Sequence, residues 1–186
     1  MSKVCVFFAP GLEECEGLLP VDLLRRAGAE VTVASITDSV TLTSSHGITL
    51  NCDCLASQVD LSAMDAIVLP GGLPGTTNLA ACPLVLDAVK SFAADPDKLV
   101  AAICAAPSIL GGLGLLQGKK ATSHAGFRDK LTGADVVDEE VVIDGNIMTS
   151  RGLGAAIPFG LALVSRLVSP EKAEHIRSAI HYQWPI

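Results

Sequence analysis

The chain has few aromatic residues and no excess of basic ones. Only 4% of its 186 residues are Phe, Trp or Tyr, while 49% are hydrophobic. The core must therefore consist mainly of Ala, Val, Leu and Ile, a composition suited to a parallel sheet covered by helices. The formal charge is -7 and the Lys and Arg residues are not clustered. Direct binding of nucleic acid or of an anionic membrane surface is therefore not expected.

Signals for secretion and membrane insertion are also missing from the sequence. Residues 1–8 lack the apolar segment and cleavage pattern of a signal peptide, and they lead directly into a glycine turn. No run that is free of glycine, proline and charge reaches the length of a membrane span. We therefore expect a cytoplasmic protein that forms a single domain over residues 1–186.

The patterns that mark metal and nucleotide cofactors are absent as well. The sequence has six cysteines, which in a cytoplasmic protein are expected to be reduced thiols: Cys5, Cys15, Cys52, Cys54, Cys82 and Cys104. Cys52 and Cys54 form a CxC pair, but no second Cys or His pair stands at zinc-site spacing. The glycine-rich segments match neither dinucleotide nor P-loop motifs. We therefore predict no metal and no cofactor.

The most informative stretch of the chain runs from Leu99 to Leu116. It opens with an apolar run, residues 99–103, which has the length of a buried strand and stops at Cys104. Residues 105–107 (Ala-Ala-Pro) are typical of a helix start. The sequence thus predicts Cys104 on a strand-to-helix turn. In α/β enzymes such a turn holds a nucleophile above the sheet, with N–H groups free to bind an oxyanion.

A free cysteine is more often an ordinary buried thiol than a nucleophile. The position of Cys104, at the end of the most apolar strand and directly before a helix start, favours the nucleophile interpretation. The dipole of the helix behind the turn would favour a thiolate. The sequence therefore predicts a lowered pKa for Cys104.

Apolar runs and helical patterns alternate along the chain. Predicted strands lie at 4–8, 30–35, 66–69, 99–103 and 121–123, and predicted helices at 12–28, 83–94, 155–168 and 170–179. Such β-loop-α-β units imply parallel strands with right-handed crossovers. A hairpin at 41–51 is predicted outside this winding, and the tight Asp144–Asn146 turn predicts a second hairpin. The fold class is therefore α/β, with a mainly parallel sheet between layers of helices.

Several polar or glycine residues follow the carboxyl ends of predicted strands. Gly71 and Gly72 follow the strand at 66–69, where glycines permit a close backbone approach with N–H groups aimed at a ligand. Cys104 and His124 each follow a later strand, and Glu16 follows the first one. Parallel sheets bind ligands outside these strand ends. We therefore expect a thiol, an imidazole, a carboxyl group and backbone donors to converge in one site.

The histidines carry different weight as candidates for this site. A lone histidine is usually a surface or hydrogen-bonded residue, and His124 is singled out only because it follows a strand end. His46, His175 and His181 fall on a hairpin, a late helix and the irregular tail, where a surface role is the favoured interpretation. A cysteine with a nearby imidazole is the minimum arrangement for thiol activation.

Three carboxylates, Glu13, Glu14 and Glu16, stand where the first helix begins. Residues of this type ordinarily interact with the helix dipole, and for Glu13 and Glu14 that is the favoured role. Glu16 is the candidate for chemistry. A carboxyl group packed against the thiol in a partly dry pocket has a raised pKa and donates a proton to sulfur.

With these residues assembled, the chain resembles the ThiJ/PfpI superfamily, most closely its parkinsonism-associated protein deglycase branch. The segments that carry the resemblance are 13–16 (EECE), 20–22 (PVD), 25–28 (RRAG), 31–34 (VTVA), 68–72 (VLPGG), 101–107 (AAICAAP) and 149–152 (TSRG). The resemblance implies a flavodoxin-like three-layer α/β/α sandwich of the class I glutamine amidotransferase type, and a homodimer. It also implies that Cys104 is the reactive cysteine, that Glu16 is its protonated partner with His124 nearby, and that Gly72 and Ala105 line the anion pocket.

The resemblance also implies an activity. It suggests a cofactor-independent enzyme, either a glutathione-independent glyoxalase (a lyase) or a protein deglycase (a hydrolase). Its substrates would be methylglyoxal, glyoxal or early glycation adducts, and it would protect against carbonyl and oxidative stress. Two alternatives remain open: a redox sensor or holdase chaperone that acts through oxidation of Cys104, and an intracellular cysteine peptidase.

Three parts of the sequence depart from the pattern of that branch. Ala105 and Ala106 stand where close relatives often have a glycine, which predicts a tighter pocket. His46 stands where the branch has an arginine, so an anion contact from that hairpin is not carried over. Residues 182–186 do not match the tail of the branch.

Overall fold

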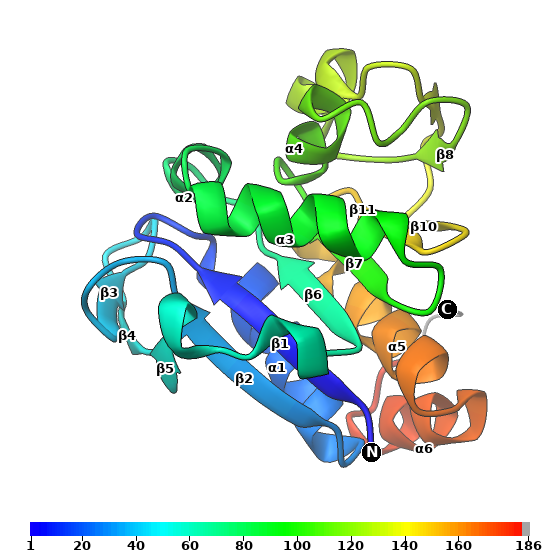
Figure 1. Cartoon of the computed structure of the whole chain (residues 1–186). Coiled ribbons are helices and arrows are strands. Elements are labelled where there is room, and N and C mark those ends of the chain that lie inside the picture. Colours follow the sequence, from blue (N-terminus) through cyan, green and yellow to red (C-terminus); the bar gives the residue numbers. More distant parts are fainter. Residues whose placement is uncertain (184–186) are drawn as a thin grey trace.

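The computed structural model describes residues 1–183, so residues 184–186 of the predicted irregular tail lie outside the described part. A sheet of seven strands runs through the molecule in the order β10-β11-β7-β6-β1-β2-β5 (Figure 1). Its strands are β1 (Lys3–Phe8), β2 (Glu30–Ser35), β5 (Cys54–Leu55), β6 (Ala66–Leu69), β7 (Leu99–Ile103), β10 (Val141–Asp144) and β11 (Ile147–Ser150).

Six of the seven strands run parallel to one another. β6 and β2 flank β1, and β7 lies between β6 and β11. Only β10 runs antiparallel, because a tight turn joins it to β11 as the sequence predicted. The carboxyl ends of β1, β6, β7 and β11 therefore lie side by side at one edge of the sheet, where ligands bind in folds of this type.

Helices cover both faces of the sheet (Figure 1). Three of them, α1 (Glu14–Arg26), α5 (Ala156–Leu167) and α6 (Pro170–Ala179), belong to one layer, and α1 packs extensively on α5. On the other side lie α2 (Gly75–Ala80), α3 (Pro83–Ala94) and α4 (Pro107–Gly112). Successive side chains of β1 point to opposite faces, so Val6 and Phe7 join different apolar cores. The prediction of a three-layer α/β/α fold is confirmed.

Short elements fill the connections between these layers. They are the hairpin β3 (Thr41–Thr43) and β4 (Thr49–Asn51), the pair β8 (Lys120–Ala121) and β9 (Asp135–Val136), and the 3-10 helices η1 (Ala56–Gln58), η2 (Leu61–Ala63), η3 (Ala125–Lys130) and η4 (Leu153–Ala155). The hairpin at 41–51 was predicted from its alternating pattern. Within residues 1–183, we find no helix with the length and apolar character needed to cross a membrane.

The strand predicted at 121–123 is wrong in extent and in place. The observed strand, β8, ends at Ala121 and pairs with β9 in a separate two-stranded sheet. The next residues leave the ladder because the Thr122 N–H donates to the Thr149 side-chain hydroxyl (3.0 Å). This side-chain link ties Thr122 to β11, and two residues later the His124 N–H donates to the carbonyl of Cys104, which directly follows β7.

Candidate active site

Cys104 lies on the turn between β7 and α4, as the sequence predicted. Its backbone is in the left-handed region (φ +65°), an uncommon conformation for a residue with a side chain. The Cys104 N–H donates to the Ser150 carbonyl of β11 (2.9 Å), which ties the turn to the neighbouring strand. The half-buried thiol is thereby held at the carboxyl edge of the sheet.

Glu16 lies in the first turn of α1 with only 1% of its surface exposed. The Glu16 N–H donates to the Glu13 carboxylate, which caps the helix (2.7 Å). On the other side, the Gly71 N–H donates to Glu16 Oε2 (3.1 Å). The Glu16 carboxyl group also hydrogen-bonds the Cys104 thiol. The two predicted partners are therefore in direct contact.

His124 is joined to the same turn through its backbone. The His124 N–H donates to the Cys104 carbonyl (2.9 Å), and the exposed ring then caps η3 by accepting the Gly126 N–H at Nδ1 (3.2 Å). Because Nδ1 is the acceptor in this bond, the neutral ring carries its proton on Nε2. His124 therefore presents a hydrogen-bond donor from this second nitrogen.

Two glycines leave room for the three side chains. A Cβ placed on Gly71 would lie 2.5 Å from Cys104 Cβ and 2.5 Å from Glu16 Oε2. A Cβ on Gly152 would lie 3.8 Å from Cys104 Sγ, 3.8 Å from Glu16 Oε1 and 3.9 Å from His124 Cδ2. Gly152 follows β11, so it was signalled by its position after a strand end, but the sequence reasoning did not select it as a site residue.

This geometry predicts that Gly71→Ala is severely harmful to the site. The added methyl group must displace either the Cys104 turn or the Glu16 carboxyl group, and a misplacement of about 1 Å can reduce catalysis about 100-fold. Gly112→Ala, at the end of α4, is the matched control, because a Cβ there meets no atom within 4 Å. Thiol alkylation rates and the circular dichroism of both variants would separate damage to the site from unfolding. Equal thiol alkylation rates and equal circular dichroism spectra for the two variants would contradict the prediction.

Backbone donors surround the sulfur atom. The N–H groups of Gly72 and Ala105 hydrogen-bond Cys104, in the positions that the family resemblance implied. Gly72 has a positive φ of +88°, and a Cβ there would lie 2.1 Å from the Glu13 nitrogen. Only glycine fits this close approach.

The thiol opens into a pocket of about 380 Å³. Its lining residues are Glu13, Ser45, His46, Gly72, Leu73, Cys104, Ala105, His124 and Phe127. The hairpin supplies two of them because the Ser45 N–H donates to the Leu12 carbonyl (2.8 Å) in the loop before α1. The sequence placed the hairpin outside the main winding and favoured a surface role for His46, because no local pattern signals this contact.

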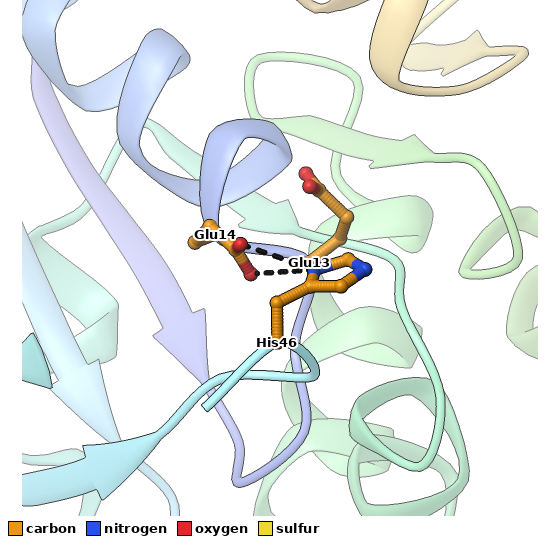
Figure 2. A group of neighbouring side chains, drawn as sticks. All are labelled: Glu13, Glu14 and His46. Carbon is orange, nitrogen blue, oxygen red and sulfur yellow. Dashed lines mark hydrogen bonds and ion pairs between the residues drawn. The ribbon is translucent and has the colours of Figure 1, made fainter. Parts of the chain in front are cut away.

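Glu13, Glu14 and His46 form the one group in residues 1–183 whose geometry could hold a metal ion (Figure 2). One potential ligand atom from each lies within 4.8 Å of the others. A hydrogen bond already accounts for two of them, because His46 Nδ1 lies 3.1 Å from Glu14 Oε1. Glu13 in turn caps α1, so each group has a role without a metal.

Burial controls the acidity of the Cys104–Glu16 pair. Burial raises the pKa of Glu16 to about 7, and the negative charge of Glu13 adds to this increase. Hydrogen bonds from Cys104 and from the Gly71 backbone act in the opposite direction and lower the pKa. Burial and the Glu16 charge likewise raise the pKa of Cys104 to about 12. The predicted lowering of the Cys104 pKa is therefore wrong. The six-residue helix α4 starts three positions beyond the thiol, and its effect is smaller than that of burial beside a carboxylate.

The raised pKa of Glu16 makes stability depend on pH. At pH below 4.5 Glu16 is protonated in both the folded and the unfolded chain, so its burial does not reduce the stability of the fold through ionisation. As the pH rises toward 7 the unfolded chain ionises first, so stability falls, by a total of about 3 kcal/mol. Glu16→Gln removes this loss, and its melting temperature should exceed that of the wild type more at pH 8 than at pH 5. A difference in melting temperature between the two proteins that is the same at pH 5 and at pH 8 would contradict this prediction.

The arrangement can carry out addition of sulfur to a carbonyl group. The thiol donates its proton to a carboxyl group whose pKa lies near neutrality, which suits a general base at physiological pH. The Gly72 and Ala105 N–H groups face the reacting sulfur, where an oxyanion would form. The His124 ring supplies a further donor beside them.

Comparisons with known proteins agree with this geometry. Protein DJ-1 homolog A of Arabidopsis thaliana is 44% identical over 182 residues, which are 96% of this chain and 46% of that protein. The chain thus spans less than half the length of this relative. A deglycase of Thermococcus kodakarensis is 39% identical over 155 residues, 82% of this chain and 91% of that protein.

The solved structures agree as well. The crystal structure of Drosophila melanogaster DJ-1beta superposes with a TM-score of 0.94 at 36% identity, covering 99% of this chain and 100% of that one. A model of the DJ-1/PfpI family matches residues 2–166, which contain every residue of the candidate site. The resemblance drawn from the sequence motifs is confirmed, and the chain belongs to the DJ-1/PfpI family.

Proposed function

We propose that the protein is a cysteine-dependent, cofactor-independent enzyme that acts on small α-oxoaldehydes such as methylglyoxal and glyoxal, or on their early adducts with proteins. The observation that carries the proposal is the direct hydrogen bond between the Cys104 thiol and the buried carboxyl group of Glu16. In this proposal the enzyme is a cytoplasmic homodimer that protects against carbonyl stress.

The first step forms a carbon–sulfur bond. The Cys104 sulfur adds to the aldehyde carbon while the thiol proton passes to the Glu16 carboxylate, which gives a hemithioacetal. The N–H groups of Gly72 and Ala105 stabilise the oxyanion that develops beside the sulfur. Because the proton moves as the sulfur attacks, a free thiolate is not required, in keeping with the raised pKa of Cys104.

The second step moves hydrogen between the two carbons of the substrate. The hydrogen on the former aldehyde carbon shifts with its electron pair to the neighbouring ketone carbon as the oxyanion becomes the thioester carbonyl, so the first carbon is oxidised to a thioester and the second is reduced to an alcohol. The ketone oxygen takes the proton of His124 Nε2–H during this transfer, and the ring regains a proton from solvent. The substrate supplies both oxidant and reductant, so no external electron carrier takes part.

Hydrolysis of the thioester completes the cycle. Water adds to the thioester carbon, the carbon–sulfur bond breaks, and a hydroxy acid leaves the restored thiol. For methylglyoxal the product is lactate. Similarity to a protein named as a deglycase supports the same chemistry on a glycation adduct, with the amine as an additional leaving group.

Product analysis tests the proposal. Purified protein, freed of metal ions with a chelator and supplied with no glutathione, is incubated with methylglyoxal, and lactate is followed by NMR. We expect lactate in amounts that continue to increase after one equivalent per protein. Loss of methylglyoxal without lactate would overturn the proposal, because the protein would then only scavenge the aldehyde with its thiols and amines.

A further inference from the structure

One member of a carboxylate–imidazole pair, the His46 ring, lines the pocket, and its partner is Glu14. Glu14 is the first residue of α1 and is 8% exposed, whereas the His46 side chain, between β3 and β4, is 66% exposed. His46 Nδ1 lies 3.1 and 3.2 Å from the two oxygens of Glu14 and 3.2 Å from Ser45 Oγ. The other ring nitrogen points away from Glu14 (Figure 2). The two residues are 32 positions apart in the sequence.

The contact with Glu14 fixes the position of the imidazole proton. Although burial acts to raise the pKa of Glu14, hydrogen bonds from its own backbone N–H, from His46 and from Ser44 hold it below the usual value. Glu14 is thus an acceptor-only carboxylate at neutral pH, and Nδ1 of His46 must be the donor. The neutral His46 ring therefore has a free lone pair on Nε2.

His46 and His124 line the same pocket with opposite tautomers. His124 Nδ1 accepts the Gly126 N–H, so in the neutral ring Nε2 carries the proton. Nε2 of that ring is therefore a donor and cannot accept a proton. His46 has the reverse arrangement, because its Nδ1 donates to Glu14. One imidazole is set up as a donor and the other as a base.

The proposed reaction needs such a base in its last step. When the thioester forms, Glu16 holds the proton taken from Cys104 and returns it to the departing sulfur. Glu13 also lines the pocket, but its carboxylate accepts the Glu16 N–H as the cap of α1. Of the groups that line the described pocket, His46 is the imidazole whose outward nitrogen is free to accept a proton from water.

We propose that His46, oriented by Glu14, is the general base that activates the hydrolytic water, an inference that rests on the proposed function. Water adds to the thioester carbon as one of its protons passes to His46 Nε2. The tetrahedral intermediate then collapses, the carbon–sulfur bond breaks, Glu16 returns its proton to Cys104, and the hydroxy acid leaves. The His46 proton is released to solvent, so atoms and charge balance.

The surroundings of His46 suit a ring that becomes charged in this step. The α1 side presents the carboxylates of Glu13 and Glu14, and its own loop presents the Ser45 hydroxyl. Cys104 and His124 line the same pocket. A positive charge on His46 is therefore paired directly with Glu14, as in the carboxylate–histidine pairs of hydrolases.

The test separates hydrolysis from the earlier steps. Wild type, His46→Gln and Glu14→Gln are mixed with excess methylglyoxal and quenched at short times, and intact-protein mass spectrometry measures the acyl adduct on Cys104. For His46→Gln we expect a burst of about one equivalent of consumed substrate, an accumulated adduct, and steady lactate formation about 100-fold slower than in the wild type. Free imidazole should restore lactate formation. Glu14→Gln should be slower by about 10-fold, and the double variant no slower than His46→Gln.

A control variant and a chelator control accompany this test. His175→Gln changes an exposed histidine of α6 and should match the wild type. A chelator should leave the rate of lactate formation unchanged if His46 accepts a proton, whereas it should lower that rate if His46 and Glu14 bind a metal ion. Full lactate turnover without adduct in His46→Gln overturns the inference while leaving the proposed function intact. A wild type that forms no lactate overturns both, and chelator-sensitive turnover overturns the role of His46 as a base.

Discussion

Cys104→Ala should abolish lactate formation from methylglyoxal, with a loss of about 10⁴-fold or more. The variant removes the atom that forms the covalent bond to substrate, and no neighbouring group can replace it, because the surrounding contacts are a carboxyl group and backbone N–H groups. Initial rates of lactate formation, measured without glutathione or metal ions, give the result directly.

The matched control for this variant is Cys15→Ala. Cys15 is exposed in the first turn of α1, between Glu14 and Glu16, so it is close to the site in sequence but does not line the pocket. Its removal should leave the rate within about twofold of the wild type. If Cys104→Ala kept its activity while Cys15→Ala lost it, the nucleophile would have to be reassigned.

Glu16→Gln should reduce the rate by about 100- to 10,000-fold, the range typical for the loss of a general acid or base. Glutamine keeps the shape of the side chain and can still accept the Gly71 N–H, but it cannot take the proton from Cys104. The Gly71 hydrogen bond that positions the side chain is thus retained, while proton transfer is lost.

The pH profile checks this role independently. In the wild type Glu16 must be ionised to accept the thiol proton, and burial raises its pKa to about 7. The rate should therefore increase about tenfold per pH unit below pH 7 and level off above it. Glu16→Gln should lack this inflection. A wild-type rate independent of pH between 5 and 8 would exclude the Glu16 carboxylate as the base.

The fold and the reactive turn could be predicted because their signals are local. Apolar runs of strand length and the Ala-Ala-Pro segment at 105–107 mark the end of β7 and the start of α4, and the structure has both within this stretch. The positions of Glu16 and Gly71 follow from the same rule, since loops at the carboxyl ends of neighbouring parallel strands must converge.

The remaining features depend on contacts that no local pattern encodes. The Cys104 pKa is raised by burial and by Glu16, both of which result from tertiary packing, so an argument from the helix dipole alone gave the wrong direction. His46 reaches the pocket only because the hairpin is bonded to the loop before α1. The strand predicted before His124 failed because a side-chain hydrogen bond replaced the sheet ladder at Thr122.

The most direct test of the catalytic Cys104–Glu16 pair is the number of lactate molecules formed per protein. Wild type, Cys104→Ala and Glu16→Gln are compared in parallel under excess methylglyoxal, without metal ions or glutathione. The account predicts many turnovers for the wild type, none for Cys104→Ala and a small fraction for Glu16→Gln. Equal, stoichiometric consumption of methylglyoxal by all three proteins, without lactate, would contradict it.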